Sequence, residues 1–456
     1  MGLKVCKFGG TSMATAEQFR KVAAIVLSDP DRKIVVVSAP GKRSKTDTKV
    51  TDMLISYAES ILANKNSEPL YRLLMERFAE IIRDLGLPEE QTATISDLLK
   101  SRAEADRNHP GRYMDGIKAL GEEISARLLA AYLRKEGHDF IYVDPREAGL
   151  ILSDEPGNAQ VLPESYDHLH RYLSSLEQRV VFPGFFGYSA SGNLVAFPRG
   201  GSDITGAILS AAMKAEIYEN FTDVDNVFAA DPRIVNNPAS IHEMTYAEMR
   251  ELSYAGFSVL HDEALQPAFN AKIPVHIKNT NNPSAAGTLI SLERNNNHEM
   301  PVVGVAGSSD FCTIFLSKYL MNREKGFGRR LLQIIEEADL SYEHCPSGID
   351  HISVIVRESA FTPEVEQRVL ERIRKELRPD KLLVKRGIAL VMIVGDGMSK
   401  RIGIAKKATA ACSDAGVNLE MINQGASENS IMFGIRKEDM NKAIIALHEA
   451  FFPSVP

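Results

Sequence analysis

The sequence is poor in the features that mark secreted, membrane-embedded or nucleic-acid-binding proteins. Its four cysteines, Cys6, Cys312, Cys345 and Cys412, are far apart, so there is neither a CxxC pair nor a dense disulfide framework. No apolar run is long enough to span a bilayer, and residues 1–12 lack the apolar core of a signal peptide. The 53 basic and 60 acidic residues leave a net charge of −7, which provides no basic field for nucleic acid. We therefore expect a reduced, cytoplasmic protein with neither nucleic acid nor a membrane as a partner.

A glycine-rich turn is present near the start, in Lys7-Phe-Gly-Gly-Thr-Ser12. A short strand precedes it, and the following helix begins with the capping-box spacing of Thr15 and Gln18. Glycines let the backbone approach a ligand closely, and a helix N-terminus offers unpaired N–H groups to an anion. Lys7 stands before the glycines, whereas the lysine of a P-loop follows them. The pattern suits a phosphate cradle or an ordinary strand-to-helix turn.

A second stretch, Arg199-Gly-Gly-Ser-Asp203, again places glycines, a cation and a hydroxyl at the start of a helix. Apolar strands such as Lys33–Ser38 and Glu216–Phe221 alternate with helices, which indicates an α/β fold with a mostly parallel sheet. Ligands of such sheets lie at the carboxyl ends of the strands, so Thr222-Asp223 is a candidate wall of a site. Residues 51–110 interrupt the alternation with helices, and we expect them to form a lid or side layer.

The last third of the chain contains a weak internal repeat. A polar segment, residues 293–299, separates it from the first part. Gly326 and Gly403 are 77 residues apart, and the same offset relates Met321 to Met398. Each copy has a strand, a glycine-containing loop, a helix and two further strands, which predicts two small α+β modules that pack together. Coincidence between two generic units of this kind is the alternative.

With these motifs in view, the chain resembles the aspartate kinases, members of the amino acid kinase family that carry two C-terminal ACT domains. The resemblance covers nearly the whole chain and rests on Lys7–Ser12, Gly121-Glu122, Gly184-Phe185, Arg199–Asp203, Thr222-Asp223-Val224, Asp231-Pro-Arg233 and Val417–Ile422. Ser38–Lys42 and Ala255–His261 resemble the clostridial and bacillary branch. The implied architecture is an amino acid kinase domain over residues 1–293, a mostly parallel sheet sandwiched by helices, followed by two βαββαβ ACT-like domains over residues 300–380 and 381–456.

The resemblance implies that ATP phosphorylates the side-chain carboxylate of L-aspartate to 4-phospho-L-aspartate, with Mg²⁺ on the phosphates. This is the first step toward lysine, threonine, methionine and diaminopimelate. An aspartate side chain, with a pKa near 3.9, is already an anion at neutral pH, so the reaction needs positioning and charge neutralisation rather than a general base. Lys7 is the expected transition-state cation. Asp203 would orient Lys7 or hold Mg²⁺ through water, or would simply favour a helix N-terminus.

The resemblance also assigns the two substrates. Arg199 would hold the α-carboxylate of aspartate, Glu122 its ammonium, and Phe185 an apolar wall, with hydroxyl contacts from Ser38, Thr51 and Ser202. The alternative for Glu122, without a role in binding, is a solvated carboxylate on a helix. The residues expected around ATP are Lys7, Phe8, Gly9, Gly10, Ser12, Thr222, Asp223, Phe228, Asp231 and Arg233. No protein metal ligands are assigned. Relatives often have Tyr for Phe228, Lys for Ser258 and Pro for Asp262, which puts details of nucleotide binding in question.

ACT domains pair edge to edge and bind amino acids at the interface. The resemblance therefore implies a homodimer or a dimer of dimers, inhibited by lysine, alone or together with threonine. The expected effector residues are Met321, Tyr342, Glu343 and Ser347, with an exposed turn carboxylate as the alternative for Glu343.

Three other classes of protein were weighed. Kinases of glutamate, acetylglutamate or UMP would share the glycine-rich turn but not the ACT pair. A non-enzymatic amino-acid sensor would not need Lys7 and Arg199. A bifunctional kinase–homoserine dehydrogenase would need a second catalytic domain after Phe452, which we do not expect.

Overall fold

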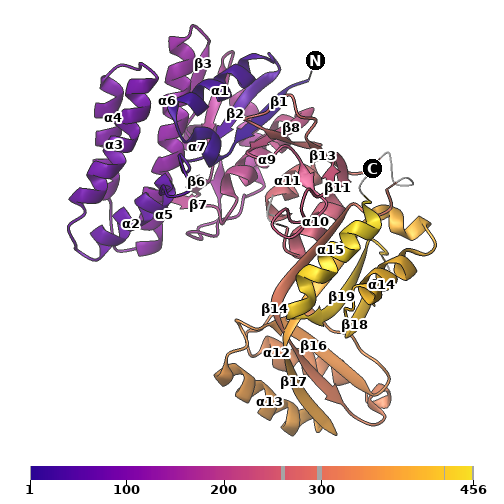
Figure 1. The fold of residues 1–456 in the computed structure, drawn as a ribbon. Helices are drawn as coiled ribbons and strands as arrows, with labels where there is room; N and C mark the ends of the chain where they lie inside the picture. The colour runs from indigo at the N-terminus through magenta and orange to yellow at the C-terminus, as the bar shows by residue number, and fades with distance from the viewer. Residues whose placement is uncertain (1, 258–261, 295–299, 426, 454–456) are drawn as a thin grey trace. The chain divides into compact units, whose positions relative to one another are not determined.

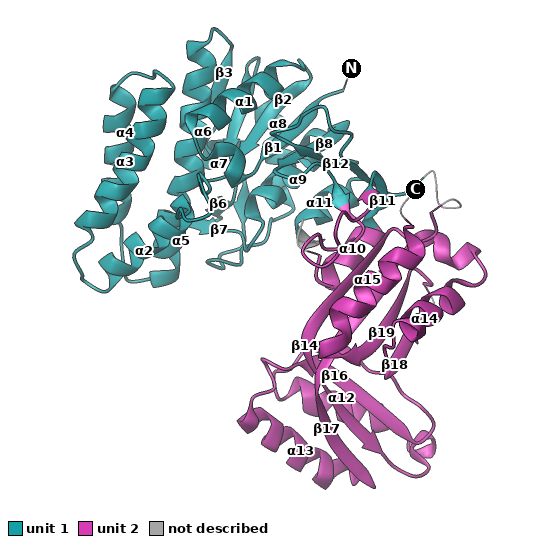
Figure 2. Cartoon of the chain, viewed as in Figure 1, with its two compact units in different colours: residues 1–227, 241–246, 259–294 teal, residues 228–240, 247–258, 295–456 magenta. Residues whose placement is uncertain are grey.

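The computed structural model describes residues 2–257, 262–294, 300–425 and 427–453 (Figure 1). Its backbone contacts divide the chain into two compact units (Figure 2). The first comprises residues 1–227, 241–246 and 259–294, and the second comprises residues 228–240, 247–258 and 295–456. In the described ranges, no helix combines the length and the apolar character needed to cross a bilayer. Each unit is described separately below.

The first unit is built on an eight-stranded sheet of order β11-β13-β12-β8-β1-β2-β5-β3. Its central strands are parallel to one another, while β13 runs antiparallel to β12. Continuous apolar runs such as residues 34–37 suit strands that are covered on both faces. The strands are β1 (Lys4–Phe8), β2 (Arg32–Val37), β3 (Phe140–Tyr142), β5 (Arg179–Pro183), β8 (Ile217–Thr222), β11 (Glu243–Thr245), β12 (Val275–Asn279) and β13 (Thr288–Ser291).

Helices cover both faces of this sheet. Helices α1 (Ala16–Leu27) and α6 (Leu120–Lys135) share one apolar core with the buried side chains of Cys6, Phe8 and Phe221. Helix α9 (Gly201–Met213) packs against β1, β2 and β8, together with α8 (Glu164–Ser174) and α11 (Gln266–Asn270). The predicted parallel sheet sandwiched by helices is confirmed.

The predicted helical layer consists of α2 (Val50–Leu62), α3 (Glu68–Asp84) and α4 (Glu90–Ala103), and α5 (Pro110–Lys118) then leads into α6. It packs on α6 and α1 through one apolar cluster. The other elements before residue 295, some of which belong to the second unit, are short. They are α7 (Pro145–Ala148), α10 (Tyr246–Tyr254), and the 3₁₀ turns η1 (Gly10–Met13) and η2 (Asp262–Leu265). A small sheet consists of β4 (Ile151–Leu152), β6 (Phe186–Ser189) and β7 (Leu194–Ala196), and β9 (Val227–Phe228) pairs with β10 (Ser240–Ile241).

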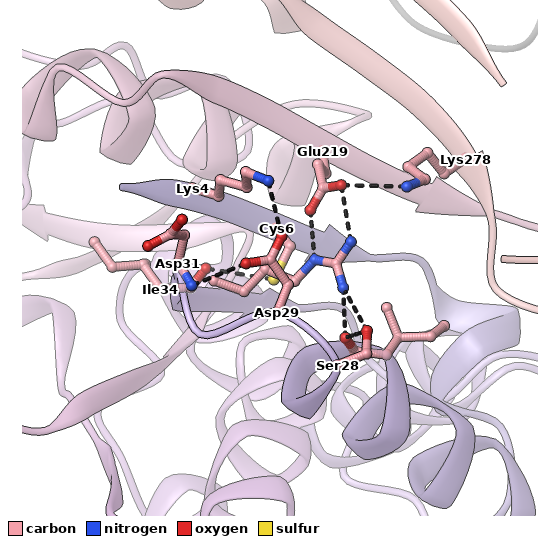
Figure 3. Close-up of polar contacts among 10 residues, drawn as sticks. Lys4, Cys6, Ser28, Asp29, Asp31, Ile34, Glu219 and Lys278 are labelled. Atoms are coloured by element: carbon pink, nitrogen blue, oxygen red, sulfur yellow. Dashed lines mark hydrogen bonds and ion pairs between the residues drawn. The ribbon is translucent and has the colours of Figure 1, made fainter. Parts of the chain in front are cut away.

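A buried ion cluster joins three strands of the sheet (Figure 3). Arg32 at the start of β2 forms two hydrogen bonds with the carboxylate of Glu219 on β8, at 2.6 and 3.0 Å. Lys278 on β12 lies 3.4 Å from the same carboxylate. Both cations also face the ring of Phe221, at 5.5 and 5.6 Å from its centroid. Hydrogen bonds from Arg32 and its charge, opposed by burial, lower the pKa of Glu219, which keeps the carboxylate ionised.

The second unit contains one six-stranded antiparallel sheet of order β15-β16-β14-β17-β19-β18. The predicted 77-residue repeat is visible in it, because β17, α14 and α15 begin at residues 381, 404 and 440, and β14, α12 and α13 at residues 304, 327 and 363. The elements are β14 (Gly304–Ser317), β15 (Tyr342–His344), β16 (His351–Arg357), β17 (Lys381–Val394), β18 (Met421–Gln424), β19 (Ser430–Arg436), α12 (Phe327–Glu336), α13 (Pro363–Leu377), α14 (Ile404–Asp414), α15 (Met440–Phe451), η3 (Met321–Arg323), η4 (Asp396–Lys400) and η5 (Lys437–Asp439).

The two copies are joined rather than separate. Strands β14 and β17 each have 14 residues and pair with each other along their length, so both run through the two halves of the sheet. Residues 228–240 and 247–258 also belong to this unit. Here the Ala229 carbonyl accepts from the N–H of Val305 at 2.7 Å, and Glu248 accepts from the N–H of Asp396 at 2.8 Å. The predicted boundary between residues 380 and 381 falls at the start of β17, and the predicted domain limits stay predictions.

Candidate active site

The candidate site lies at the carboxyl edge of the parallel strands in the first unit. The segments that leave these strands continue the hydrogen bonding of the sheet for one more residue. The Ser38 N–H donates to the Phe8 carbonyl at 3.1 Å, and the Gly184 N–H donates to the Val37 carbonyl at 3.0 Å. The Gly9 N–H donates to the Phe221 carbonyl at 3.1 Å. These bonds fix the loops that follow β1, β2, β5 and β8 side by side.

The first glycine-rich turn is packed too tightly for side chains. The Gly41 N–H donates to the Gly10 carbonyl at 2.7 Å, and a Cβ at Gly41 would lie 2.6 Å from the Gly10 carbonyl carbon. The chain then enters η1, and the Thr15 side chain caps α1 by accepting from the Gln18 N–H at 3.3 Å, as predicted. The loops at Gly10 and Gly41 are therefore in direct backbone contact.

Lys7 connects the two glycine-rich turns. Its ammonium lies 2.6 Å from the Asp203 carboxylate in the first turn of α9, and the side chains are 9% and 15% exposed. Asn220 on β8 donates to the same Asp203 oxygen at 2.8 Å. A Cβ on Gly9 would lie 3.7 Å from the Lys7 nitrogen, so this cation sits directly beside the turn. The structure contains the geometry for two of the expectations for Asp203, since it pairs with Lys7 and also lies in the first turn of α9.

Glu122 is a buried carboxylate with an unused oxygen. It lies in the first turn of α6 and is 6% exposed, and its Oε2 has no hydrogen-bond partner among the described residues. Burial raises the pKa of this carboxyl to about 8, an effect that nearby backbone N–H groups, Lys118 and Lys7 only partly offset. The solvated carboxylate considered from the sequence is therefore excluded. Gly121 lets α6 approach the Ser38 loop, since its Cβ would lie 2.5 Å from that of Ala39.

The wall after β5 carries an unusual backbone. Phe185 has a φ of 78°, in the left-handed region that bulky residues rarely adopt. Its N–H donates to the Thr205 hydroxyl at 3.1 Å, which helps to hold the turn. A Cβ at Gly184 would lie 2.6 Å from Ser202, so the turn and the start of α9 are in contact.

Lys118 lies at the candidate site but was not among the residues predicted from the sequence. Its ammonium lies 5.5 Å from the centroid of the Phe185 ring and 2.9 Å from the buried carboxylate of Asp115. Because it stands four positions before Glu122 in a helical stretch, helical spacing alone would have placed it near that carboxylate.

Other predicted site residues have fewer contacts that would fix their side chains. Arg199 is exposed, and its guanidinium has no ion pair within the described part of the chain. Ser38 and Thr51 are half-buried, while Ser12 is buried with its hydroxyl 2.7 Å from that of Thr280. Thr222 bonds to Asp223 at 3.3 Å.

Three predicted nucleotide residues fall in the second unit, namely Phe228, Asp231 and Arg233. Asp231 and Arg233 pair with each other at 2.6 Å. Ser258 lies outside the described residues, as does the side chain of Asp262.

The predicted effector residues also belong to the second unit. Glu343 is not an exposed turn carboxylate: it lies in β15, its side chain is 11% exposed, and it pairs with Arg357 at 3.0 Å and with the Tyr254 hydroxyl. Met321 is buried, whereas Tyr342 is half-exposed. Ser347 lines a cavity of about 480 Å³ on the sheet together with Lys381, Lys385 and Glu420.

Comparison with known proteins decides the family. A model of the amino acid kinase family matches residues 2–279, and a model of the ACT domain matches residues 391–451. Aspartokinase 3 of Bacillus subtilis (strain 168) is 52% identical over 453 residues, which is 99% of each chain. The chain is an aspartate kinase of the amino acid kinase family.

Solved structures of other aspartate kinases have the same fold. The Clostridium acetobutylicum aspartate kinase is 36% identical with a TM-score of 0.84, and the match covers 98% of this chain and 100% of that one. Escherichia coli aspartokinase III matches over 99% of this aspartate kinase. Its complex with aspartate and ADP has 25% identity, a TM-score of 0.73 and 100% coverage of that chain. Its complex with lysine and aspartate has 26% identity, a TM-score of 0.70 and 99% coverage. The predicted enzyme class and the bacillary resemblance are confirmed.

Proposed function

We propose that this aspartate kinase transfers the γ-phosphoryl group of ATP to the side-chain carboxylate of L-aspartate. A carboxylate oxygen bonds to the γ-phosphorus, the bond to the β–γ bridging oxygen breaks, and ADP leaves with that electron pair. The observation that carries this proposal is Lys7, which lies between both glycine-rich turns and 2.6 Å from Asp203. The E. coli enzyme that binds aspartate and ADP supports the choice of substrates.

In this proposal, Lys7 neutralises charge on the transferred group and Gly10 supplies a backbone N–H group to the phosphates. The N–H of Gly9 already donates to the Phe221 carbonyl, so Gly9 contributes only the close approach of the backbone. Asp203 and Asn220 keep the lysine ammonium in place. Within the described ranges, no cluster of three acidic, histidine or cysteine side chains could form an all-protein metal site. Mg²⁺ typically uses substrate phosphates, waters and one or two carboxylates, which fits Asp203 as a water-mediated contact. Bound Mg²⁺ would neutralise phosphate charge.

The aspartate ammonium is proposed to bind Glu122. An ammonium beside the unpartnered Oε2 would give this buried carboxylate the charge and the donor that it lacks. Arg199, exposed at the second glycine-rich turn, is proposed to take the α-carboxylate through its planar fork. Ser38, Thr51, Ser202 and Phe185 complete the proposed pocket. The proposed nucleotide contacts in the first unit are Phe8, Ser12, Thr222 and Asp223. The nucleotide roles of Phe228, Asp231 and Arg233, which belong to the second unit, stay predictions.

We propose feedback inhibition by lysine, alone or together with threonine, through the ACT region. The lysine complex of E. coli aspartokinase III supports the choice of lysine. Because Glu343 already pairs with Arg357, an effector ammonium there would have to share or replace that partner. We further propose a cytoplasmic homodimer or dimer of dimers formed through ACT domains, acting at the first step toward lysine, threonine, methionine and diaminopimelate.

The test is phosphoryl transfer to L-aspartate with hydroxylamine present, which converts an acyl phosphate into a hydroxamate. Hydroxamate formation that requires ATP, Mg²⁺ and aspartate is expected. The control variant is Lys7→Ala under identical conditions. Hydroxamate from glutamate or acetylglutamate, or UDP from UMP, and no hydroxamate from aspartate, would refute the proposal.

A further inference from the structure

Arg77 is a buried guanidinium that contacts two loops of the active site. It belongs to α3 in the helical layer, and its side chain is 3% exposed. Its Nη2 donates to the Ala14 carbonyl at 3.0 Å and to the Gly41 carbonyl at 2.8 Å. Its Nη1 donates to the Asp47 carboxylate at 3.2 Å, which supplies the opposite charge. One side chain thus binds backbone on both sides of the Gly10–Gly41 contact.

The two carbonyls belong to loops with different proposed tasks. Ala14 follows η1 and ends the glycine-rich turn of Gly9 and Gly10, and its N–H donates to the Thr11 carbonyl. Gly41 lies in the loop between β2 and α2 that begins at Ser38, and its N–H donates to the Gly10 carbonyl at 2.7 Å. Arg77 therefore closes a chain of contacts from the phosphate-side turn to the loop carrying Ser38.

A guanidinium suits this task because its donors lie in one rigid plane and it stays protonated. Burying a charge is costly unless it is paired, and packing alone would be served as well by an apolar side chain. Asp47 is itself held in place by the exposed Arg43, whose backbone N–H and Nε donate to the Asp47 carboxylate at 2.8 and 3.0 Å. The arrangement directs hydrogen bonds at two loop carbonyls rather than filling space.

We propose that Arg77 is a positioning residue for phosphoryl transfer, which sets the separation between the phosphate-side turn and the loop that carries Ser38. This inference rests on the proposed roles of Gly9, Gly10 and Ser38. Displacing reacting groups by about 1 Å can cost about 10²-fold in rate. The helical layer would then act on the reaction through one side chain that touches neither substrate.

The test compares Arg77→Lys and Arg77→Ala with Arg43→Ala in the full-length enzyme. Arg43 is the matched control, because it pairs with the same Asp47 and with Glu80 but bonds to neither loop carbonyl. We expect kcat to fall about 10²-fold in Arg77→Ala, with the KM of ATP and of aspartate within threefold of wild type. Arg77→Lys should fall at least tenfold, because one ammonium cannot reproduce the planar fork. Arg43→Ala should keep kcat within threefold.

Chemical rescue separates positioning from simple structural support. Millimolar guanidinium ion should restore part of kcat in Arg77→Ala, while it leaves the wild type and Arg43→Ala unchanged. If Arg77→Ala does not fold, Arg77→Lys alone decides the matter through its kcat, measured far below its Tm.

A folded Arg77→Lys or Arg77→Ala enzyme with kcat within threefold of wild type would overturn the inference. So would a loss that appears only as raised KM values or as a lowered Tm. Failure of the proposed function is seen separately, since the wild-type enzyme would then form no hydroxamate from aspartate and ATP.

Discussion

Replacing Glu122 with glutamine is expected to stabilise the unliganded enzyme at neutral pH and to weaken its binding of aspartate. The reason is the burial of a carboxyl whose Oε2 has no partner among the described residues. Its pKa is raised from 4.5 to about 8 by burial, so the folded protein keeps a proton that the unfolded chain releases. Glutamine has nearly the same shape and carries no charge in either state.

The sign follows from proton linkage. Between pH 4.5 and about 8 the folded state binds more protons at this site than the unfolded state does, so the free energy of unfolding falls as pH rises. The free energy of unfolding decreases from the unperturbed pKa of 4.5 up to pH 7, a range of 2.5 pH units. At about 1.36 kcal/mol per unit, this decrease amounts to about 3 kcal/mol at pH 7. Below pH 4.5 the loss vanishes. Glu122→Gln should therefore gain about 3 kcal/mol over wild type at pH 7 and almost nothing at pH 4.5.

Differential scanning calorimetry without substrates is the direct assay. The Tm difference between Glu122→Gln and wild type should widen by several degrees from pH 5 to pH 8. Glu123→Gln is the matched control, because Glu123 is the next residue and equally buried but pairs with Arg102 at 3.2 Å and Arg127 at 2.9 Å. Its loss leaves cations without a partner and should lower Tm at pH 8.

Aspartate binding by the wild type should improve as pH rises, whereas its stability falls. If an ammonium needs ionised Glu122, the wild-type KM for aspartate should fall about tenfold per pH unit up to pH 7.5, because the ionised fraction grows at that rate below a pKa of about 8. The Glu122→Gln KM should be high and independent of pH. A Tm advantage that is equal at pH 5 and pH 8, or a variant that binds aspartate normally, would refute this reasoning.

Three further outcomes are expected. Lys7→Ala should lower kcat at least about 10³-fold with an unchanged circular dichroism spectrum; an effect confined to KM would remove its role on transferred charge. Arg199→Ala should raise the aspartate KM about 10- to 100-fold, the loss of a charged hydrogen bond, and the ATP KM little; the reverse pattern in steady-state kinetics would exchange the two loops. L-lysine should inhibit the wild type, alone or together with threonine, and Glu343→Ala should weaken inhibition while leaving uninhibited kcat nearly unchanged. Identical lysine titrations for the two proteins would place the effector site elsewhere.

Local patterns allowed much of the fold to be predicted. The Thr15 cap and the helices of the side layer depend on spacings within one segment, the 77-residue repeat depends on a constant offset between two segments, and the structure contains all of them. The contact between Lys7 and Asp203 was expected only from the family resemblance, because Asp203 follows β7 of the small sheet rather than a strand of the main sheet.

Contacts between distant segments were not predictable in this way. Arg77 stands 36 residues from Gly41 and 63 from Ala14, and nothing in its helix distinguishes it from a surface arginine. Glu343 was read as exposed or as an effector ligand because its hydroxyl partner, Tyr254, is 89 residues away. The positive φ of Phe185 was not predictable either, since the left-handed region of backbone conformation favours glycine.

The ion cluster of Figure 3 has a consequence for synthesis on the ribosome. Arg32 emerges 187 residues before Glu219, and Lys278 emerges a further 59 residues after Glu219. Strand β1 pairs with β2 early, but its other neighbour, β8, is still to be made. Until then the Arg32 cation lacks the Glu219 carboxylate that it pairs with in the folded protein, and burying it without that partner would be costly. We therefore expect the core around Arg32 to close only after β8 has been synthesised.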